Sequence, residues 1–393
     1  MSEHIASTDK LWSKNFIFAW IANFLMGFAF YLLIPTLPFY LIDRFSADAS
    51  TIGIIVSSYV IAALVVRLFS GYIIDKFPRK MVYVLSFSLF LLFYFGYFFA
   101  ATVTLVFLLR ILHGFTWGVI TTSGSTVALD ITPHQMRGQA VGYYGLSLNV
   151  AMALSPVVAI FVYDHWGANA LFSTAVMTSL LGLIFASLIH VPHKPVKKHT
   201  PISLDRFLLL KAIPVGINLL FATISYGMVL SFAAMYGKSM GATSGFFYIL
   251  LAIGTGGARI FSGKLIDSGK ISQVTTAGLL LLTVSFAMFA LVQTPLVFYA
   301  AALTIGLGYG ICHPAFQTMI ISMSHHDMRG TANSTFFTAF DLGVGLGMYL
   351  AGKIASVSNL SISFGVSAAA HLVALLYFLK ISISSYKKNK IEQ

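Results

Sequence analysis

The sequence predicts an all-α integral membrane protein whose twelve transmembrane helices form two pseudo-symmetric six-helix bundles. The chain has 393 residues, of which 58% are hydrophobic and only 9% are charged, whereas a soluble domain carries about a quarter charged residues. Apolar stretches of roughly 20 residues, the length that crosses a bilayer, recur along the whole chain. A sequence pattern also recurs after about half the chain. Together these features predict a membrane protein built from two copies of one unit.

The apolar stretches are predicted to be helices. Strands of a membrane barrel would alternate polar and apolar residues, and these stretches do not. Six of them precede the middle of the chain and six follow it. The predicted spans are approximately 14–42, 51–74, 80–100, 104–128, 139–163, 168–190, 208–236, 243–266, 272–292, 295–321, 331–353 and 359–381.

The repeat is seen in two pairs of short segments. "RLFSGYIIDK" at 67–76 matches "RIFSGKLIDS" at 259–268, and "HQMRG" at 134–138 matches "HDMRG" at 326–330. Both pairs are separated by 192 residues (259 − 67 and 326 − 134). A fixed offset of this kind indicates an internal duplication. Because each copy has an even number of spans, both copies enter the membrane from the same side, which makes the repeats parallel.

The duplication divides the chain into three parts. We expect an N-terminal six-helix bundle at 1–190 and a C-terminal six-helix bundle at 208–393. The segment between them, 191–207, is rich in proline and basic residues, and we expect it to be a cytoplasmic linker.

The basic residues predict the orientation in the membrane. The net charge is +12, and 18 of the 24 Lys and Arg residues lie in the two tails and the even-numbered connections. Arg44, Lys238 and Lys353 lie on the opposite side. Cytoplasmic loops carry an excess of Lys and Arg, so both termini are predicted to be cytoplasmic in a multi-pass protein of the cell membrane. This distribution also argues against a nucleic-acid partner.

Several classes of chemistry have no motif in the sequence. There is no P-loop or dinucleotide-binding fingerprint, and no His, Cys and Asp cluster has the spacing of metal ligands. The single cysteine, Cys312, lies within a predicted span. We therefore expect no enzyme activity, no cofactor and no metal.

Two motifs of the first half resemble those of the major facilitator superfamily. "GYIIDKFPRK" at 71–80 resembles the signature of the connection between helices two and three, with Pro78 where glycine is usual. "RILHGFTWG" at 110–118 resembles the Arg-x-x-x-Gly motif of the fourth helix. The residues that match are Gly71, Asp75, Lys76, Arg79, Lys80, Arg110, Gly114 and Gly118.

Two further motifs are similar to those of the twelve-helix drug/proton antiporter branch. "IPTLPFYL" at 34–41 has the paired prolines of its first helix. "ALSPVVA" at 153–159 is similar to the antiporter motif of helix five, although Ser155 stands where glycine precedes Pro156. The resemblance implies a transporter that carries a small molecule and protons across the lipid bilayer, acts as a monomer and alternates its access between the two sides.

The repeated acid and bases at the cytoplasmic helix ends suggest a gate. A carboxylate there stabilises the positive N-terminal end of an adjoining helix, and the family implies that such contacts hold the cytoplasmic gate shut. The alternative is that these charges only set the topology, to which acids contribute little. Arg67 and Arg259 are expected to support the gate, with substrate contact as the alternative. The gate residues are Gly71, Asp75, Lys76, Arg79, Arg137, Asp267 and Arg329, with Arg67 and Arg259.

Charged residues inside spans are the candidates for proton coupling. A charge there costs about 2.5–3.5 kcal/mol on insertion scales, so it must face a cavity or a partner. Arg110 has the position that the family uses in coupling, and His113 shares its helical face. Asp341 alone among the acids is predicted mid-span, and desolvation favours the protonated form of a carboxylate. For each of these residues, a packing role is the alternative.

Other polar and aromatic residues complete the predicted cavity. Asn149 is the counterpart of Asp341 at the 192-residue offset, so the site is asymmetric. The first span offers Asn23 where related antiporters have an acid. His313 precedes Pro314, where a break in the helix frees backbone carbonyls to line a cavity, with a local backbone bond as the alternative. Further candidates for an aromatic pocket are Phe24, Phe28 and Phe336.

The resulting expectation is proton-coupled efflux of a small, moderately hydrophobic compound. One acid and an arginine in an aromatic-rich cavity suit a cationic or zwitterionic substrate. The alternatives are export of an endogenous metabolite, such as a sugar or a metallophore, and proton-driven uptake of a small solute.

Overall fold

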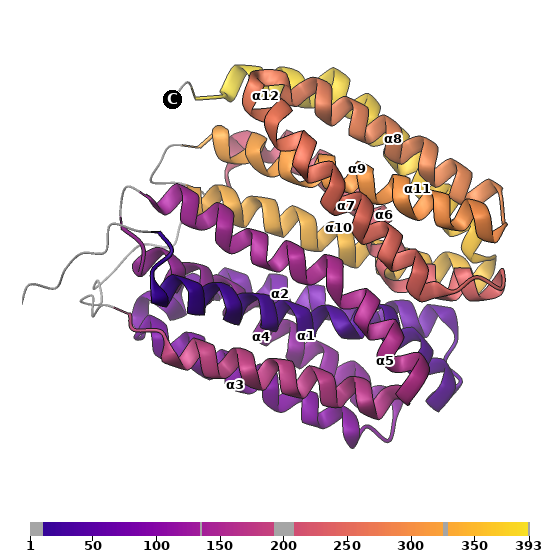
Figure 1. Cartoon of the computed structure of the whole chain (residues 1–393), viewed down its shortest axis with the longest axis horizontal. Coiled ribbons are helices and arrows are strands. Elements are labelled where there is room, and N and C mark those ends of the chain that lie inside the picture. The colour runs from indigo at the N-terminus through magenta and orange to yellow at the C-terminus, as the bar shows by residue number, and fades with distance from the viewer. Residues whose placement is uncertain (1–10, 134–135, 192–207, 325–328, 392–393) are drawn as a thin grey trace, which may run out of the picture.

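The computed structural model describes residues 11–133, 136–191, 208–324 and 329–391. Within these ranges the chain is helical and forms no strand, and eleven helices are long and apolar enough to cross a membrane. Figure 1 shows them lying side by side along the long axis. They are α1 (Lys14–Phe45), α2 (Ala49–Lys76), α3 (Arg79–Phe98), α4 (Val103–Asp130), α5 (Arg137–Leu188), α6 (Ile213–Ser239), α7 (Ser244–Leu265), α8 (Ile271–Leu291), α9 (Pro295–Ser322), α10 (Arg329–Val357) and α11 (Leu360–Tyr377), which continues through a π-helical turn (Phe378–Ser382) into α12 (Ile383–Asn389).

The long helix α5 contains two of the predicted passes. It reverses at Gly167, whose φ of 76° and ψ of −172° are accessible in practice only to glycine. Contacts with the first turns of α1 show the reversal: Trp20 donates to the Tyr143 carbonyl near the start of α5, and Asn15 donates to the His190 carbonyl just beyond its end. The middle of α5 contacts the opposite end of α1. The chain therefore makes twelve passes, as the sequence predicted.

The sequence repeat is also a repeat of helix packing. A Cβ on Gly114 of α4 would lie 2.2 Å from the Tyr59 carbonyl oxygen of α2. A Cβ on Gly306 of α9 would lie 2.3 Å from the Leu251 carbonyl oxygen of α7. Tyr59 and Leu251 are themselves 192 residues apart, and the next glycine of each motif repeats the contact one turn later. Only glycine permits helix backbones to approach so closely.

The helices before the linker gather on one side of the molecule and those after it on the other. Figure 1 shows the indigo to magenta helices α1–α5 below and the later, orange to yellow helices above. Between the two groups, α2 packs on α10, α1 on α6 and α5 on α7. We call the end that holds Asn15, His190 and Ile391 the termini end. The other end, which holds the turn between α1 and α2, is the far end.

The contact of α2 with α10 is a close backbone contact at the far end, and we call it the first seam. A Cβ on Gly352 would lie 2.3 Å from the Ala49 carbonyl oxygen, and one on Gly53 would lie 3.0 Å from the Gly352 Cα. Two turns further in, a Cβ on Gly345 would lie 2.4 Å from a methyl group of Val60. The glycines therefore bring the two helices together along a shared face.

The contact of α5 with α7 is the counterpart of the first seam, and we call it the second seam. By the 192-residue offset, Gly53 corresponds to Gly245 and Gly352 to Ile160. A Cβ on Gly245 would lie 3.6 Å from Ile160 Cγ2, which is an ordinary van der Waals distance. The second seam is thus formed by positions that correspond to those of the first seam, but its glycine has more space than the glycines between α2 and α10.

Candidate functional site

An ion pair between the two halves lies along the first seam. The Nη2 of Arg67 in α2 lies 2.7 Å from Oδ2 of Asp341 in α10, and the side chains are only 13% and 7% exposed. Arg67 follows Val60 by two helical turns, and Asp341 precedes Gly345 by about one turn, so the close approach of the helices sets the two charges opposite each other. The sequence predicted a gate role for Arg67, with substrate contact as the alternative, and proton coupling for Asp341. The structure pairs these two residues with each other.

Aromatic side chains enclose this ion pair. Tyr31, Tyr59 and Trp117 lie within electrostatic range of the Asp341 carboxylate. Phe30 stacks on Trp117 with ring centroids 3.9 Å apart and an interplanar angle of 15°. The pair therefore lies in an environment of low polarity, where a charge interaction is stronger than in water.

Arg110 of α4 packs against the aromatic residues that enclose the Arg67–Asp341 ion pair. It is fully buried, and its Nη2 donates to the Val56 carbonyl at 3.0 Å. Its guanidinium carbon lies 4.7 Å from the Tyr59 ring centroid and 5.5 Å from that of Phe30. Cation–π contacts of a desolvated arginine are worth about 2 kcal/mol. Arg110 therefore fixes two of the aromatic rings near Asp341 and has no acidic partner among the described residues.

His113 lies within the first half, away from the contact between the halves. Its Nδ1 lies 3.2 Å from the Tyr97 hydroxyl, and its Nε2 lies 3.2 Å from the Phe90 carbonyl oxygen. Its ring is fully buried against those two residues and Tyr94. Because both nitrogens have partners, this geometry fits a packing role better than a place in a cavity.

Asn23 and Ser155 hold α1 against α5. Asn23 Nδ2 donates to the Tyr144 carbonyl at 3.1 Å, and Ser155 Oγ donates to the Phe28 carbonyl at 2.8 Å. Ser155 precedes Pro156 in the motif that is similar to the antiporter motif, at the position where that motif has glycine. Its hydroxyl adds a hydrogen bond to α1 that a glycine could not make. Both residues are buried between helices of one half.

His313 lies in an aromatic cluster of the second half. Its ring centroid is 5.1 Å from Tyr226, 5.0 Å from Tyr309 and 5.1 Å from Phe340. Phe340 in turn stacks with Phe336 at 6.0 Å. The side chain of His313 is buried, and its Nε2 has no hydrogen-bond partner among the described residues. A buried nitrogen without a partner calls for an explanation, because such groups are rare.

Arg259 lies beside this cluster at the position that corresponds to Arg67. It is partly buried, lies within electrostatic range of Tyr226 and His313, and has a buried Nε with no hydrogen-bond partner. No ion pair to Arg259 occurs among the described residues. Asn149, the counterpart of Asp341, is a partly buried residue of α5. The second half of the site thus holds a cation without an acid.

At the termini end the structure describes contacts of two residues predicted for the gate, Arg79 and Lys76. Arg79 Nη1 donates to both carboxylate oxygens of Asp130, at 2.8 and 2.7 Å, and so joins the start of α3 to the end of α4. Sequence reasoning did not select Asp130, although both residues were predicted at the same end of neighbouring antiparallel spans. Lys76 lies 5.9 Å from the ring centroid of Phe77. The structure does not describe the surroundings of Gly71 or the side chains of four other predicted gate residues, Asp75, Arg137, Asp267 and Arg329.

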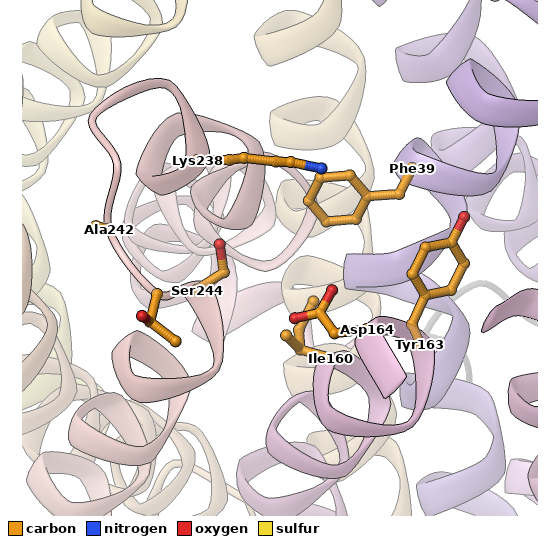
Figure 2. A pocket seen from close by; sticks show the side chains of 8 residues that line it. Phe39, Ile160, Tyr163, Asp164, Lys238, Ala242 and Ser244 are labelled. Carbon is orange, nitrogen blue, oxygen red and sulfur yellow. The ribbon is translucent and has the colours of Figure 1, made fainter. Parts of the chain in front are cut away.

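A pocket of about 150 Å³ lies between the halves at the far end. Figure 2 shows Lys238 of α6 extending toward Phe39 of α1, with Asp164 and Tyr163 of α5 on the facing wall. The Lys238 ammonium lies 5.4 Å from the Phe39 ring centroid. In the sequence Lys238 is only one of the three basic residues on the side opposite the termini, and nothing there places it near Phe39.

A comparison with protein families identifies the chain. The model of the Major Facilitator Superfamily matches residues 19–348, most of the sequence. The chain belongs to the major facilitator superfamily. It is therefore a multi-pass membrane transporter of a small molecule rather than an enzyme, and the predicted fold class is confirmed.

Relatives within the superfamily include exporters. The chain is 24% identical over 392 residues to the multidrug resistance protein MdtG of Klebsiella pneumoniae, covering 95% of this chain and 94% of that protein. It is 24% identical over 332 residues to the staphylopine export protein of Staphylococcus aureus, covering 79% and 82%. Among solved structures, a D-xylose–proton symporter has a TM-score of 0.77 at 16% identity, covering 93% of this chain and 97% of that one, which supports the shared fold.

Proposed function

We propose that this transporter exports a small, moderately hydrophobic, cationic or zwitterionic compound in exchange for protons by alternating access. The observation that carries the proposal is the Arg67–Asp341 ion pair. It joins the two halves, and Asp341 is buried on a helix where only a strong functional or structural reason retains an acid. The similarity to the staphylopine export protein supports the direction of transport, and the similarity to the multidrug resistance protein MdtG supports a small-molecule substrate.

The exchange follows from competition for one carboxylate. While Asp341 is ionised, Arg67 occupies it and the halves stay joined along the first seam. A proton neutralises Asp341, and the cationic group of a substrate replaces Arg67. Either event removes the ion pair and favours the alternative arrangement of the halves. Because one carboxylate cannot hold both ligands, proton binding and substrate binding oppose each other.

The proposal includes an orientation and a division into halves. The termini end is cytoplasmic, as the excess of Lys and Arg in the tails and even-numbered connections indicates. The bundles 1–190 and 208–393 move relative to each other about the seams, and Arg79, with the neighbouring charges at the termini end, belongs to the cytoplasmic gate. The protein acts as a monomer.

The test begins with finding a transported compound. A deletion strain is grown across a panel of toxic compounds, and its excreted metabolites are compared with those of the parent. The compound that differs is then followed in proteoliposomes with an imposed pH gradient. We expect substrate movement against its gradient and a counterflow of protons. Substrate movement without proton flux would contradict the exchange mechanism.

A second candidate function is export of an endogenous metabolite by the same machinery. The similarity to the staphylopine export protein favours it. Loss of one excreted compound from the deletion strain, without a change in drug sensitivity, distinguishes this function from drug efflux. Accumulation of the compound inside wild-type cells would instead indicate proton-driven uptake.

A further inference from the structure

The second seam repeats the geometry of the first seam but lacks its acid. At the far end, Gly245 meets Ile160 as Gly53 meets Gly352, so α7 and α5 are in the register that the 192-residue offset requires. Further along, Arg259 is the equivalent of Arg67. The position that holds Asp341 in the first seam holds Asn149 in the second. The amide keeps the size of the acid and removes its charge.

The surroundings of Arg259 supply further groups without partners. The Nε of Arg259 and the Nε2 of His313 are buried and have no hydrogen-bond partner among the described residues. His313 is only 3% exposed, so the unsatisfied nitrogen is not a surface group. The ring centroid of Tyr226 lies 5.1 Å from that of His313, and both residues are within electrostatic range of Arg259. The Arg259 Nε–H is therefore a donor without an acceptor among the described residues, and the Nε2 of His313 is a donor in one of its two neutral tautomers.

We infer that Arg259, with His313 and Tyr226, binds a carboxylate carried by the transported compound. An unpaired cation in a membrane span is costly and is retained for a function. A guanidinium presents a planar fork that matches a carboxylate with two parallel hydrogen bonds. In the first seam that carboxylate is Asp341; in the second seam the substrate supplies it.

The inference rests on the proposed function and narrows its substrate class. Tyr31 of the first half lies within electrostatic range of Asp341 and of Tyr226 in the second half. Tyr226 in turn lies within electrostatic range of Arg259, so the two tyrosines lie in the region between Asp341 and Arg259. A compound lying against them places an amine at Asp341 and a carboxylate at Arg259. The substrate is therefore a zwitterion rather than a simple cation.

The test uses matched pairs of compounds in proteoliposomes containing the full chain. The probes are fluorescent aromatic amines, each supplied with a free carboxylate and as its uncharged carboxamide, with transport driven by a pH gradient. We expect the wild type to prefer the carboxylates. A hydrogen bond to a charged group is worth about 1.5–3 kcal/mol, so Arg259→Gln should reduce carboxylate transport roughly tenfold or more. Carboxamide transport should stay unchanged.

A second variant tests the geometry, and its effect on stability is measured without any substrate. Asn149→Asp places a carboxylate opposite Arg259, as Asp341 lies opposite Arg67. We expect a higher unfolding temperature in detergent and loss of the preference for carboxylates, because the new acid occupies the site. The gain in stability should disappear when Arg259→Gln is added, since the variant then has no cation to pair with.

The outcomes separate the inference from the proposed function. Proton-driven transport of carboxamides with no Arg259-dependent preference for carboxylates would overturn the inference and leave the export function standing. Transport of neither series under a pH gradient, with no proton flux, would remove the proposed function. A stability gain from Asn149→Asp that persists without Arg259 would show that the two residues do not face each other, and would also overturn the inference.

Discussion

The two seams between the halves are made from corresponding positions of one duplicated sequence, yet they differ in packing and in charge. In the first seam a glycine meets a glycine at the far end, and Arg67 is neutralised by Asp341. In the second seam a glycine meets Ile160, and Arg259 forms no ion pair with any acid whose side chain the structure describes. The difference shows how a duplicated scaffold acquires an asymmetric site: Asn149 in place of the acid removes the charge that would face Arg259, and Ile160 in place of glycine leaves more space between the helices.

The asymmetry assigns separate tasks to the seams. The first seam is self-contained, because its charges cancel within the protein, and a proton is the smallest ligand that can disturb it. The second seam needs an external anion to become neutral. Under this division, changes in the first seam should alter coupling and stability, whereas equivalent changes in the second seam should alter substrate selection.

The largest effect should come from Asp341→Asn. The amide keeps the shape of the side chain but cannot carry a proton, so substrate accumulation driven by a pH gradient should fall to the passive level in proteoliposomes. Asp48→Asn is the matched control, because Asp48 caps the first turn of α2 through the backbone N–H groups of Ser50 and Thr51 and should not affect coupling. If Asp341→Asn still supports accumulation, Asp341 is a packing residue and the coupling role passes to His313 or His113.

The next largest effect should come from Arg67→Gln. Removing one partner of a buried ion pair leaves an uncompensated charge and costs about 3–5 kcal/mol, which should lower the thermal unfolding temperature of the purified protein. Adding Asp341→Asn should recover most of this loss, because no charge is then left unpaired. Arg259→Gln is the control in the second seam, where loss of a cation without an acid should cost no stability. Equal destabilisation by the two arginine changes would contradict the comparison.

A smaller effect should come from Gly352→Ala. The new methyl group would lie 2.3 Å from a backbone oxygen of α2, which cannot move without the helix. Overpacking of this kind costs about 1–3 kcal/mol and should shift the protein toward an arrangement open at the far end. Spin-label distances between the halves measure this shift. Gly245→Ala is the matched control, since its methyl group would lie 3.6 Å from Ile160 Cγ2; a shift of similar size there would show that the seams are equally tight.

The smallest effect should come from Lys238→Met at the pocket beside the second seam. The cation–π contact with Phe39 joins the halves at the far end, and such a contact at an accessible site is worth about 0.5–1 kcal/mol. Its loss should change the ratio of far-end open to closed molecules roughly two- to fivefold in the same distance measurement. Lys353→Met, at an exposed residue of the far end, should leave the ratio unchanged. An identical response from both lysines would indicate a general charge effect.

Much of the fold was predictable because it depends on patterns within short stretches of the sequence and on the internal repeat. Long apolar runs specify helices in a bilayer, where every backbone group must be bonded within its own segment. The duplication predicted equivalent packing, and Gly114 and Gly306 fulfil it against backbone carbonyls 192 residues apart. The boundary that differed most is that of the last helix, which continues as α12 to Asn389, beyond the predicted end at 381. The prediction followed the apolar run, whereas the helix continues through the basic residues Lys387 and Lys388.

The site was less predictable because its contacts join distant residues. The sequence selected Asp341, Arg110 and His113, but residue type and spacing within a helix do not reveal which helix lies opposite. His113 has both nitrogens occupied inside one half. Tyr31 and Tyr226 were not selected, since buried tyrosines are common in membrane helices and only their position between the halves distinguishes them.

The sequence by itself determined the membrane class, the twelve passes, the duplication and the loss of the acid at Asn149, because each follows from composition, periodicity or a comparison of the chain with itself. The tertiary structure alone decided that Arg67 is the partner of Asp341. The physical reason is that the pair depends on how closely α2 approaches α10. That approach is set by Gly53 and Gly352, which lie about four and about three helical turns from Arg67 and Asp341.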